Sequence, residues 1–350
     1  MSTRTQAQPH SGAATNQKSV QIAQGNGGLL TRELIESLFL SAADKQLDTR
    51  HDSATVACEW PYLCMTTDSF VVTPAIFPGG NVGSLSVYGT VNDLAVVGAT
   101  PKYISTAFIL EEGFPLETLE TIVNGLYKAA SETGVSVITG DTKVVPKNAG
   151  GGVYITSTGI GYAESSPIWD SSLIREGDVI LVSGTIGDHG ATVMLAREEF
   201  GLGAELKSDC ASVLPLVALV KDLEGVRFLR DPTRGGLSVL LHDIVQETGF
   251  DIQLDESKIP IRPEVESVCD ILGLDPHVLA CEGRLVAVVS PEISDEVLNK
   301  WRNLDCGRGA ENIGMVKKSG GSKGRVLIST SIGGCRMMNQ LEEEPLPRIC

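Results

Sequence analysis

No stretch of this 350-residue sequence approaches the roughly 18 consecutive apolar residues that a membrane-spanning helix needs, although 42% of its residues are hydrophobic. The first residues also lack the charged-then-apolar pattern of a secretory signal peptide. We therefore expect a globular, cytoplasmic protein that does not contact a membrane.

Runs of basic residues are absent as well. The chain has 28 Lys and Arg residues against 44 Asp and Glu residues, a formal net charge of −16. Such a chain repels the phosphate backbone of nucleic acids, and no basic cluster offsets the repulsion over a binding-sized surface. We therefore exclude nucleic acid as a partner.

The cysteines form no recognisable framework. All eight are scattered, with no C-x-x-C and no Cys/His cluster at zinc-binding spacing. Cys58 and Cys64 lie closest together, but alternation in the strand predicted at 62–66 favours a structural role for them over a metal site. A chain with this much core material also has little need of disulfides.

The two best-known nucleotide-binding signatures are missing, since neither a Walker G-x-x-x-x-G-K-[ST] nor a complete G-x-G-x-x-G occurs. Glycine is nevertheless abundant, with 38 residues. Glycine clusters at 25–28, 79–80 and 235–236 each precede a predicted helix, the first of which should span about 30–46. Helix N-termini supply backbone N–H groups to anions, so these clusters are candidate phosphate sites of another kind.

Short β-branched runs alternate with helical patterns along most of the chain, which predicts a mixed α/β fold in two domains. We place an N-terminal domain at 19–166 and a C-terminal domain at 167–335. Residues 1–18 read as a disordered leader, and residues 336–350, which are acidic and contain two prolines, read as a flexible tail.

Aspartates recur where predicted strands end. Asp68, Asp141 and Asp231 each close such a run. Carboxylates gathered at that edge without lysine partners repel one another unless a divalent cation lies between them, and Mg²⁺ is the natural candidate. Asn92 and Asp93 interrupt a run of small and apolar residues, where an unpaired carboxylate is costly. Either local backbone groups satisfy Asp93, or it reaches the same cation, which we favour. Aspartates around Mg²⁺ usually indicate a nucleotide, whose phosphates complete the coordination.

The last residue is Cys350, on a tail stiffened by prolines. A thiol in that position can enter an active site and leave it, as a covalent carrier must. The alternative is an incidental cysteine at a frayed terminus, and sequence physics alone leaves both open.

Several motifs together resemble one family. They are TTDS (66–69), FPGGNVG (77–83), GTVNDLAVVGA (89–99), ITGDTKVV (138–145), SGTIGDHGA (183–191), DPTRGG (231–236), CEGRLV (281–286) and the terminal PLPRIC. In these motifs, and from about residue 19 to the end, the chain resembles the HypE family of hydrogenase expression/formation proteins. That family belongs to a wider group of ATP-using proteins with aminoimidazole ribonucleotide synthetase and selenophosphate synthetase.

The resemblance implies an α/β, two-domain, aminoimidazole ribonucleotide synthetase-like fold, a homodimer paired through its N-terminal halves, and ATP bound between the domains. It also implies a reaction. A partner carbamoyltransferase loads a carbamoyl group onto Cys350, and ATP drives its dehydration to a thiocyanate. The cyanide then passes to an iron-carrying hydrogenase maturation scaffold complex that serves [NiFe] hydrogenase.

The resemblance further assigns site residues. As Mg²⁺ ligands it implies Asp68, Asp93, Asp141 and Asp231. As nucleotide-binding residues it implies these four with Gly25, Gly27, Gly28, Asn92, Arg234 and Gly235. Lys143 and Glu282 would handle the protons of the carbamoyl nitrogen, with the choice of base between them left open.

Some positions are ambiguous or depart from the family pattern. His189 fits either a tail or phosphate contact or a plain turn residue. Gln24 and Asn26 stand where the family usually has His and Ser, and Pro232 replaces the more usual Ala and cannot donate a backbone hydrogen bond.

Two rival functions remain at this point. One is an ATP-dependent kinase or synthetase that acts on a free small molecule, without using the tail. The other is a non-catalytic scaffold that keeps ATP as a structural ligand and only presents Cys350 to a partner.

Overall fold

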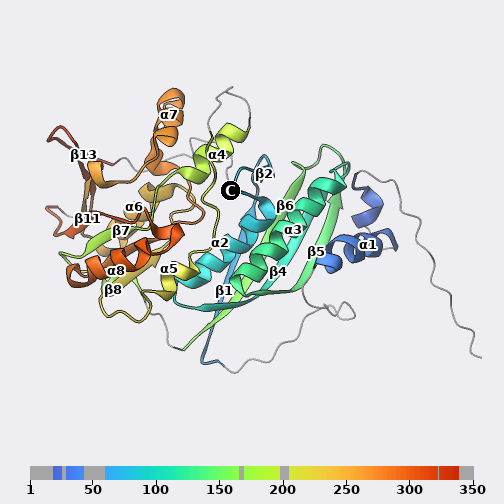
Figure 1. Ribbon diagram of the computed structural model, residues 1–350, viewed down its shortest axis with the longest axis horizontal. Helices are drawn as coiled ribbons and strands as arrows, with labels where there is room; N and C mark the ends of the chain where they lie inside the picture. The colour runs from blue at the N-terminus through green and yellow to red at the C-terminus, as the bar shows by residue number, and fades with distance from the viewer. Residues whose placement is uncertain are drawn as a thin grey trace, which may run out of the picture.

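The computed structural model describes residues 19–25, 29–42, 60–164, 169–197, 205–321 and 323–338. The predictions for residues 1–18, Asn26, Gly27, Gly28, Cys58 and Cys350 lie outside these ranges. The mixed α/β class is confirmed, because two sheets with helices packed on them account for the described chain (Figure 1).

The first sheet has four strands in the order β1-β6-β4-β5, with β4 and β5 parallel and the other neighbours antiparallel. Its strands are β1 (Tyr62–Phe70), β6 (Val153–Ala163), β4 (Thr100–Glu111) and β5 (Ser136–Val145). A separate small hairpin pairs β2 (Ile76–Phe77) with β3 (Gly80–Asn81).

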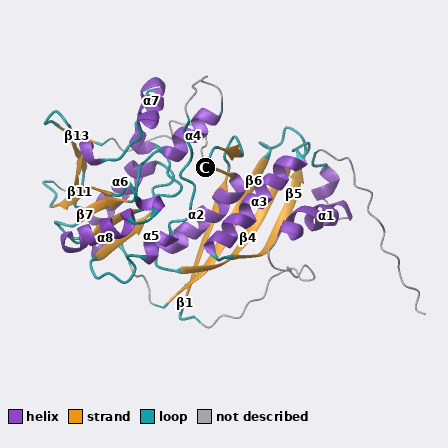
Figure 2. Ribbon diagram, in the orientation of Figure 1, coloured by secondary structure: helices purple, strands orange, loops and turns teal. Residues whose placement is uncertain are grey.

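Two helices, α2 (Val82–Val96) and α3 (Leu116–Thr133), cover one face of this sheet (Figure 2). Helix α2 begins where expected after the glycines at 79–80, since the Asn81 side chain accepts from the N–H groups of Gly83 and Ser84 in a capping box. Helix α3 is amphipathic and ends at Gly134, whose φ of 70° is left-handed. Almost every residue of α2 is buried, so polar groups on it need partners or a site.

The second sheet has seven strands in the order β13-β12-β9-β11-β7-β10-β8. They are β13 (Cys335–Met337), β12 (Val326–Ser329), β9 (Asp251–Asp255), β11 (Glu311–Lys317), β7 (Val179–Val182), β10 (Val286–Val289) and β8 (Val226–Arg230). The central strands β7 and β10 are buried on both faces and read as continuous apolar runs.

Helices lie on both faces of this second sheet. One core joins α6 (Gly236–Thr248) to inward residues such as Val182 and Val286, and the other joins α5 (Leu214–Ala218) and α8 (Ser294–Arg302) to residues such as Leu181 and Ala287. Helices α4 (Asp188–Ala196) and α7 (Pro263–Leu272) pack together beside the sheet.

The remaining elements are short. They are η1 (Ile22–Gly25), α1 (Leu29–Leu34), the π-helical η2 (Ile35–Leu40), η3 (Ser171–Leu173), η4 (Glu256–Lys258), η5 (Pro276–Val278), η6 (Pro291–Ile293) and η7 (Asp305–Gly307). The helix predicted at 30–46 therefore exists over its described part, with a π-helical second half. No helix in the described ranges is long and apolar enough to cross a membrane.

One extended segment, residues 205–213, ties the two sheets together. The Ser208 N–H donates to the carbonyl of Pro78 at 2.9 Å, and Cys210 is buried in the core of the first sheet and its helices. The Asn92 side chain on α2 accepts from the Val213 N–H at 2.9 Å and donates to the Ala211 carbonyl at 3.1 Å. This segment of the second half is thus packed into the first half.

Candidate functional site

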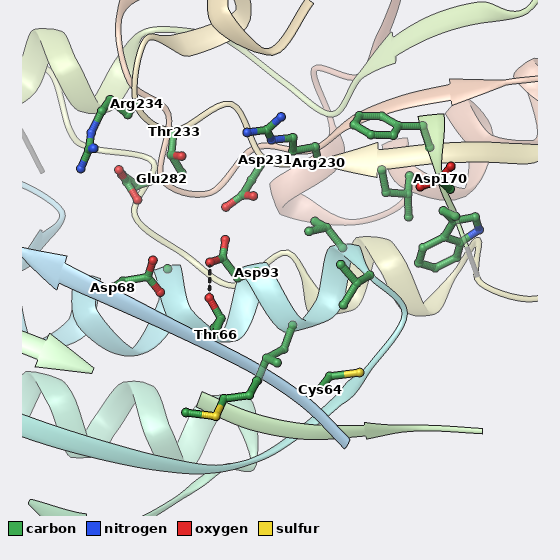
Figure 3. Close-up of a pocket in the computed structure, with 18 of the residues that line it drawn as sticks. Cys64, Thr66, Asp68, Asp93, Asp170, Arg230, Asp231, Thr233, Arg234 and Glu282 are labelled. Carbon is green, nitrogen blue, oxygen red and sulfur yellow. Dashed lines mark hydrogen bonds between the residues drawn. The ribbon is translucent and has the colours of Figure 1, made fainter. Parts of the chain in front are cut away.

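A cavity of about 710 Å³ lies where β1 and α2 of the first half face the end of β8 in the second half (Figure 3). One side of it is acidic and the other apolar. The apolar side includes Met65, Phe70, Leu94, Val97, Trp169 and Phe228. The acidic side carries Asp68, Asp93, Asp231 and Glu282, with Arg234 beside them.

These four acids come from four separate elements. Asp68 lies on the helix-facing side of β1, Asp93 on α2, Asp231 directly after β8, and Glu282 ahead of β10. Figure 3 shows Asp231 and Asp93 pointing toward one another and Glu282 lying across the cavity from Asp68. The fold therefore brings together residues more than 200 positions apart in the sequence.

Two threonines orient the first two carboxylates. Thr66 Oγ1 donates to Asp93 Oδ2 at 2.8 Å, and Thr90 Oγ1 donates to Asp68 Oδ2 at 3.2 Å. Asp93 thus has a side-chain partner, Thr66. The sequence left two alternatives for Asp93, a contact with local backbone groups or with a cation, and this hydrogen bond is neither of them. The hydroxyls leave the other carboxylate oxygens available to a ligand.

The acids disfavour one another's charge. Burial, and then the neighbouring Asp93, raises the pKa of Asp68 to about 6, and the same two causes raise the pKa of Asp231 to about 7. Burial also raises the pKa of Asp93, and burial followed by Asp231 raises that of Glu282 well above its ordinary value. A bound cation would relieve this repulsion and restore the ionised forms.

The donor set fits Mg²⁺ chemically but does not complete its coordination. Asp231 Oδ2 is buried and has no hydrogen-bond partner within the described structure. Carboxylate oxygens are hard ligands of the kind that Mg²⁺ prefers. No three acidic, histidine or cysteine side chains in the described ranges converge closely enough to hold a metal on their own. Mg²⁺ at this place would therefore need oxygens from water or phosphate.

Asp209, which the sequence analysis missed, holds the turn that carries Glu282. Its two carboxylate oxygens accept from the N–H groups of Glu282 and Gly283, each at 3.2 Å. A Cβ on Gly283 would lie 1.9 Å from the Asp209 carbonyl oxygen, so only glycine allows this close approach. Arg284 places its Nε 3.6 Å from Asp209 Oδ2 and balances the buried charge.

Arg284 also connects Glu282 to the SGTIGDHGA motif. Asp188 Oδ2 accepts from Thr185 at 2.6 Å, from Arg262 at 3.0 Å and from Arg284 at 3.2 Å. The neighbouring His189 is fully buried, and its Nδ1 lies 2.8 Å from Ser208 Oγ. His189 lies in α4 and not in a turn, and it is not among the residues that line the cavity; its contact with phosphate or the tail stays a prediction.

Asp141 and Lys143 do not join the other site residues within one chain. Both residues are on β5, where they pair with Ala107 and Ile109 of β4 and lie on the outer face of the sheet. Asp68 on β1 instead pairs with the buried Ser157 of β6, on the helix-covered face. The Lys143 Nζ lies 3.5 Å from Asp141 Oδ2, and both side chains are more than half exposed.

The expectation that Asp68 and Asp141 end their strands was wrong. Strand β1 continues to Phe70, and β5 continues to Val145, because their ladders with β6 and β4 extend that far. Asp231 does follow its strand directly, as predicted.

The other predicted nucleotide contacts remain predictions. Gly235 has the left-handed φ of 74° that caps α6, and Arg234 before it lines the cavity. Asn92 directs both ends of its amide at residues 211 and 213, away from the cavity lining. Gly25 ends η1.

Two family models match the chain. The model for AIR synthase related protein, N-terminal domain, matches residues 50–163, and the model for the C-terminal domain of the same family matches residues 175–327.

Curated relatives match over nearly the full length. Carbamoyl dehydratase HypE of Escherichia coli is 41% identical, over 95% of this chain and 99% of that protein. Carbamoyl dehydratase HypE of Cupriavidus necator is 44% identical, over 95% of each chain.

Solved structures agree with these matches. A crystal structure of hydrogenase maturation protein HypE in complex with ATP superposes with a TM-score of 0.89 at 41% identity, covering 94% of this chain and 99% of that one. HypE in a HypE-HypF complex gives a TM-score of 0.76 at 38% identity, covering 89% of this chain and 100% of that one. A thiamine monophosphate kinase at 18% identity, with a TM-score of 0.58, shares the fold alone.

Proposed function

Because the chain belongs to the HypE family of carbamoyl dehydratases, we propose that it uses ATP to dehydrate a carbamoyl group on the thiol of Cys350, leaving a thiocyanate. The cyanide ligand of [NiFe] hydrogenase would derive from this group. The observation that carries the proposal is a set of four carboxylates that face one cavity between the two halves, the buried Asp231 and Glu282 and the half-buried Asp68 and Asp93. Such a set needs a cation and suits a polyphosphate.

We infer that Asp68, Asp93 and Asp231 hold Mg²⁺ together with phosphate oxygens of ATP. The unpartnered Asp231 oxygen and the raised pKa values of Asp68 and Asp231 support this assignment. When bound, the ion would neutralise charge on the transferred phosphoryl group. Arg234, which also faces the cavity, adds a fixed positive charge beside the phosphates.

The chemistry balances in two steps. In the first, the carbamoyl oxygen attacks the γ-phosphorus of ATP, the nitrogen loses one proton, and ADP leaves. In the second, the nitrogen loses its other proton, the C–O bond breaks, and phosphate departs as the C≡N bond forms. Amide oxygen is a poor leaving group and phosphate is a good one, so phosphorylation makes the dehydration feasible.

Glu282 is the proposed base for the nitrogen protons. It lies on the acidic side of the cavity, and Asp209 fixes its backbone, so its carboxylate has a defined position. Burial raises its pKa well above the ordinary value, which makes its ionised form a stronger base. Cation binding would keep that ionised form populated at neutral pH.

A homodimer is part of the same proposal. Among the described residues, no helix covers the outer face of the first sheet, which exposes Leu63 on β1 and Ile109 on β4, at 59% and 41% (Figure 2). Lys143 lies on this face, on the side of the sheet away from Glu282. A role for Lys143 or Asp141 in phosphate or tail binding therefore requires that they act on the site of a second copy.

We propose two protein partners beyond the second copy. One is a carbamoyltransferase that loads Cys350, which the solved complex of a relative, HypE-HypF, supports. The other is an iron-carrying hydrogenase maturation scaffold complex that accepts the cyanide, and it rests on the family relationship alone.

Mass spectrometry of the C-terminal peptide tests the proposal. We expect Cys350 to gain a carbamoyl group from the loading partner and to lose one water per carbamoyl group when Mg·ATP is added. Wild-type protein with a non-hydrolysable ATP analogue and the Cys350→Ala variant serve as controls. A kinase acting on a free small molecule predicts no change on Cys350, and a scaffold predicts a loaded group that ATP does not convert.

A further inference from the structure

The turn that carries Glu282 is fixed by main-chain contacts on both sides of that residue. The Cys281 N–H donates to the carbonyl of Pro232 at 3.0 Å, and the Ala211 N–H donates to the carbonyl of Glu282 at 3.2 Å. Pro232 directly follows Asp231, whose carboxylate faces the cavity. One of these contacts therefore connects the proposed base to the backbone beside a proposed Mg²⁺ ligand.

The other contact leads to α2. Asn92 is fully buried on that helix, where its Nδ2 donates to the Ala211 carbonyl at 3.1 Å and its Oδ1 accepts from the Val213 N–H at 2.9 Å. Ala211 thus bonds to Asn92 through its carbonyl and to Glu282 through its N–H. The next residue on α2 is Asp93, which lines the cavity. Two hydrogen bonds in series therefore connect Glu282 to the helix position beside Asp93.

Asp209 completes the attachment. Its side chain is wholly shielded from solvent, and its two carboxylate oxygens accept from the N–H groups of Glu282 and Gly283, each at 3.2 Å. Gly283 lies so close to the Asp209 carbonyl that no side chain fits between them. Because the turn and residues 209–211 are in direct contact, a displacement of one displaces the other.

This attachment opposes a repulsion between like charges. Burial raises the pKa of Glu282 well above its ordinary value, and so do four acidic neighbours, which are Asp231, Asp209, Asp93 and Asp68. An unrestrained carboxylate would turn away from these charges. A fixed backbone restricts how far the Glu282 side chain can retreat from the cavity.

We propose that residues 209–213 form a frame that holds Glu282 at a set distance from Asp93, and that Asn92 and Asp209 are positioning residues of the proton-removal step. Neither Asn92 nor Asp209 is among the residues that line the cavity. Both therefore act through Glu282 and not on the nucleotide or the carbamoyl group, so the inference rests on the proposed function.

Proton transfer explains why the frame matters for the rate. A base removes a proton only within hydrogen-bond reach, about 2.6 to 3.2 Å between heavy atoms. A displacement of about 1 Å, caused by a substitution away from the reacting atoms, can slow a reaction roughly a hundredfold. Nucleotide binding does not require Glu282 at that distance. Loss of the frame should therefore lower the conversion rate and leave binding unchanged.

Single-turnover conversion of the carbamoylated full-length protein at saturating Mg·ATP, followed by the mass of the C-terminal peptide, tests the inference. We expect Asn92→Ala and Asp209→Asn each to slow conversion roughly 10- to 100-fold, with Mg·ATP affinity and carbamoyl loading within about twofold of wild type. Combined with Glu282→Gln, each should slow conversion further by less than about twofold, because no carboxylate remains to be positioned. A general loss of structure would instead add to the effect of Glu282→Gln.

Asp188→Asn is the matched control. Asp188 is buried like Asp209 and accepts from the same Arg284, at 3.2 Å. Its other hydrogen-bond partners among the described residues are Thr185 and Arg262, and not the turn. The variant should lose stability as Asp209→Asn does, because both break a buried charge pair, yet it should convert within about threefold of wild type.

Two further measurements apply if Asp209→Asn does not fold, since removal of that charge leaves Arg284 with one partner fewer. Asp209→Glu keeps the charge but moves the carboxylate by one methylene group, and it should show the same pattern as Asn92→Ala. Hydrogen exchange of the ATP-free protein needs no reaction. Asn92→Ala should accelerate exchange over 281–285 roughly tenfold more than Asp188→Asn does, the net contribution of about one hydrogen bond.

Four results would overturn the inference. They are conversion at the wild-type rate in folded Asn92→Ala or Asp209→Glu, equal slowing by Asp188→Asn, slowing that persists in full beside Glu282→Gln, and equal exchange over 281–285 in Asn92→Ala and Asp188→Asn. All four leave the dehydratase proposal standing. That proposal fails if the wild-type protein does not convert the carbamoyl group, and its choice of base fails if Glu282→Gln converts normally. The exchange result is independent of both.

Discussion

At the scale of single residues, the acidic cavity governs how stability depends on pH. The pKa of Asp231 is raised from 3.8 to about 7, so between these values the native state binds a proton that the unfolded state has released. Without nucleotide, stability should therefore fall as the pH rises from about 4 to about 7. Asp68, with a pKa raised to about 6, adds to the effect in the same direction.

Asp231→Asn should remove part of that dependence, because the amide is neutral throughout. We expect the variant without nucleotide to be more stable than wild type at pH 7.5 by up to a few kcal/mol, since one pKa unit corresponds to about 1.4 kcal/mol. Its affinity for Mg·ATP should fall. Denaturant unfolding at pH 5 and 7.5, with Asp222→Asn at an exposed position as a surface control, measures the first effect. Equal destabilisation at both pH values would contradict this account of the site.

Glu282→Gln separates binding from proton transfer. ATP affinity and carbamoyl loading should persist, while conversion to thiocyanate should fall by roughly 10² to 10⁴, the usual contribution of a positioned acid–base group. The carbamoylated tail should accumulate, which a time course of the C-terminal peptide mass would show. Wild-type conversion in this variant would eliminate Glu282 as the base. Failure to load would assign it to docking.

At the scale of elements, the segment 205–213 is held by Asn92. Asn92→Ala leaves the Ala211 carbonyl and the Val213 N–H without their partners, which should cost about 2 to 3 kcal/mol of unfolding free energy. Because its amide does not face the cavity, Mg·ATP affinity should stay within about twofold of wild type. Calorimetry on the folded variant checks this. A loss of affinity as large as that of Asp68→Asn would make Asn92 a nucleotide ligand after all.

The strands show what local sequence could and could not predict. Alternation located β1, β4, β5 and β6 and the helices between them, because each element carries its own periodicity. The sequence did not predict on which face of the sheet Asp141 and Lys143 lie, because β5 contains a β-bulge. Ile104 pairs with Val137 but Ser105 pairs with Thr139, so one extra residue in β5 turns Asp141 and Lys143 outward. Regular alternation from the buried Val137 would have placed both inside.

The sequence predicted only part of the site, because one of its contacts joins residues that are far apart in the chain. Asp68, Asp93, Asp231 and Glu282 stand in recognisable motifs, and the fold does gather them at one cavity. Asp209 stands in no motif, and its role depends on a turn 73 residues later in the chain. The only local signal was Gly283, which must be glycine because the Asp209 backbone approaches it.

At the scale of the whole molecule, the exposed sheet face should pair with a second copy. Ile109→Glu places a charge on β4, an inner strand of that face, and should convert the dimer to monomer. Met337→Glu, at a residue that is 60% exposed on β13, is the control and should leave the dimer intact. Sedimentation velocity distinguishes the two. A dimer that survives Ile109→Glu would move the interface elsewhere and separate Lys143 from any site in a second copy.

The account's central claim is that the carbamoyl oxygen leaves as phosphate. Loading Cys350 with a carbamoyl group whose oxygen is ¹⁸O, and then adding Mg·ATP, tests it in a single turnover. We predict that the label appears in inorganic phosphate in step with formation of the cyano group on the tail. Formation of the cyano group with the label released as water, and none in phosphate, would contradict it.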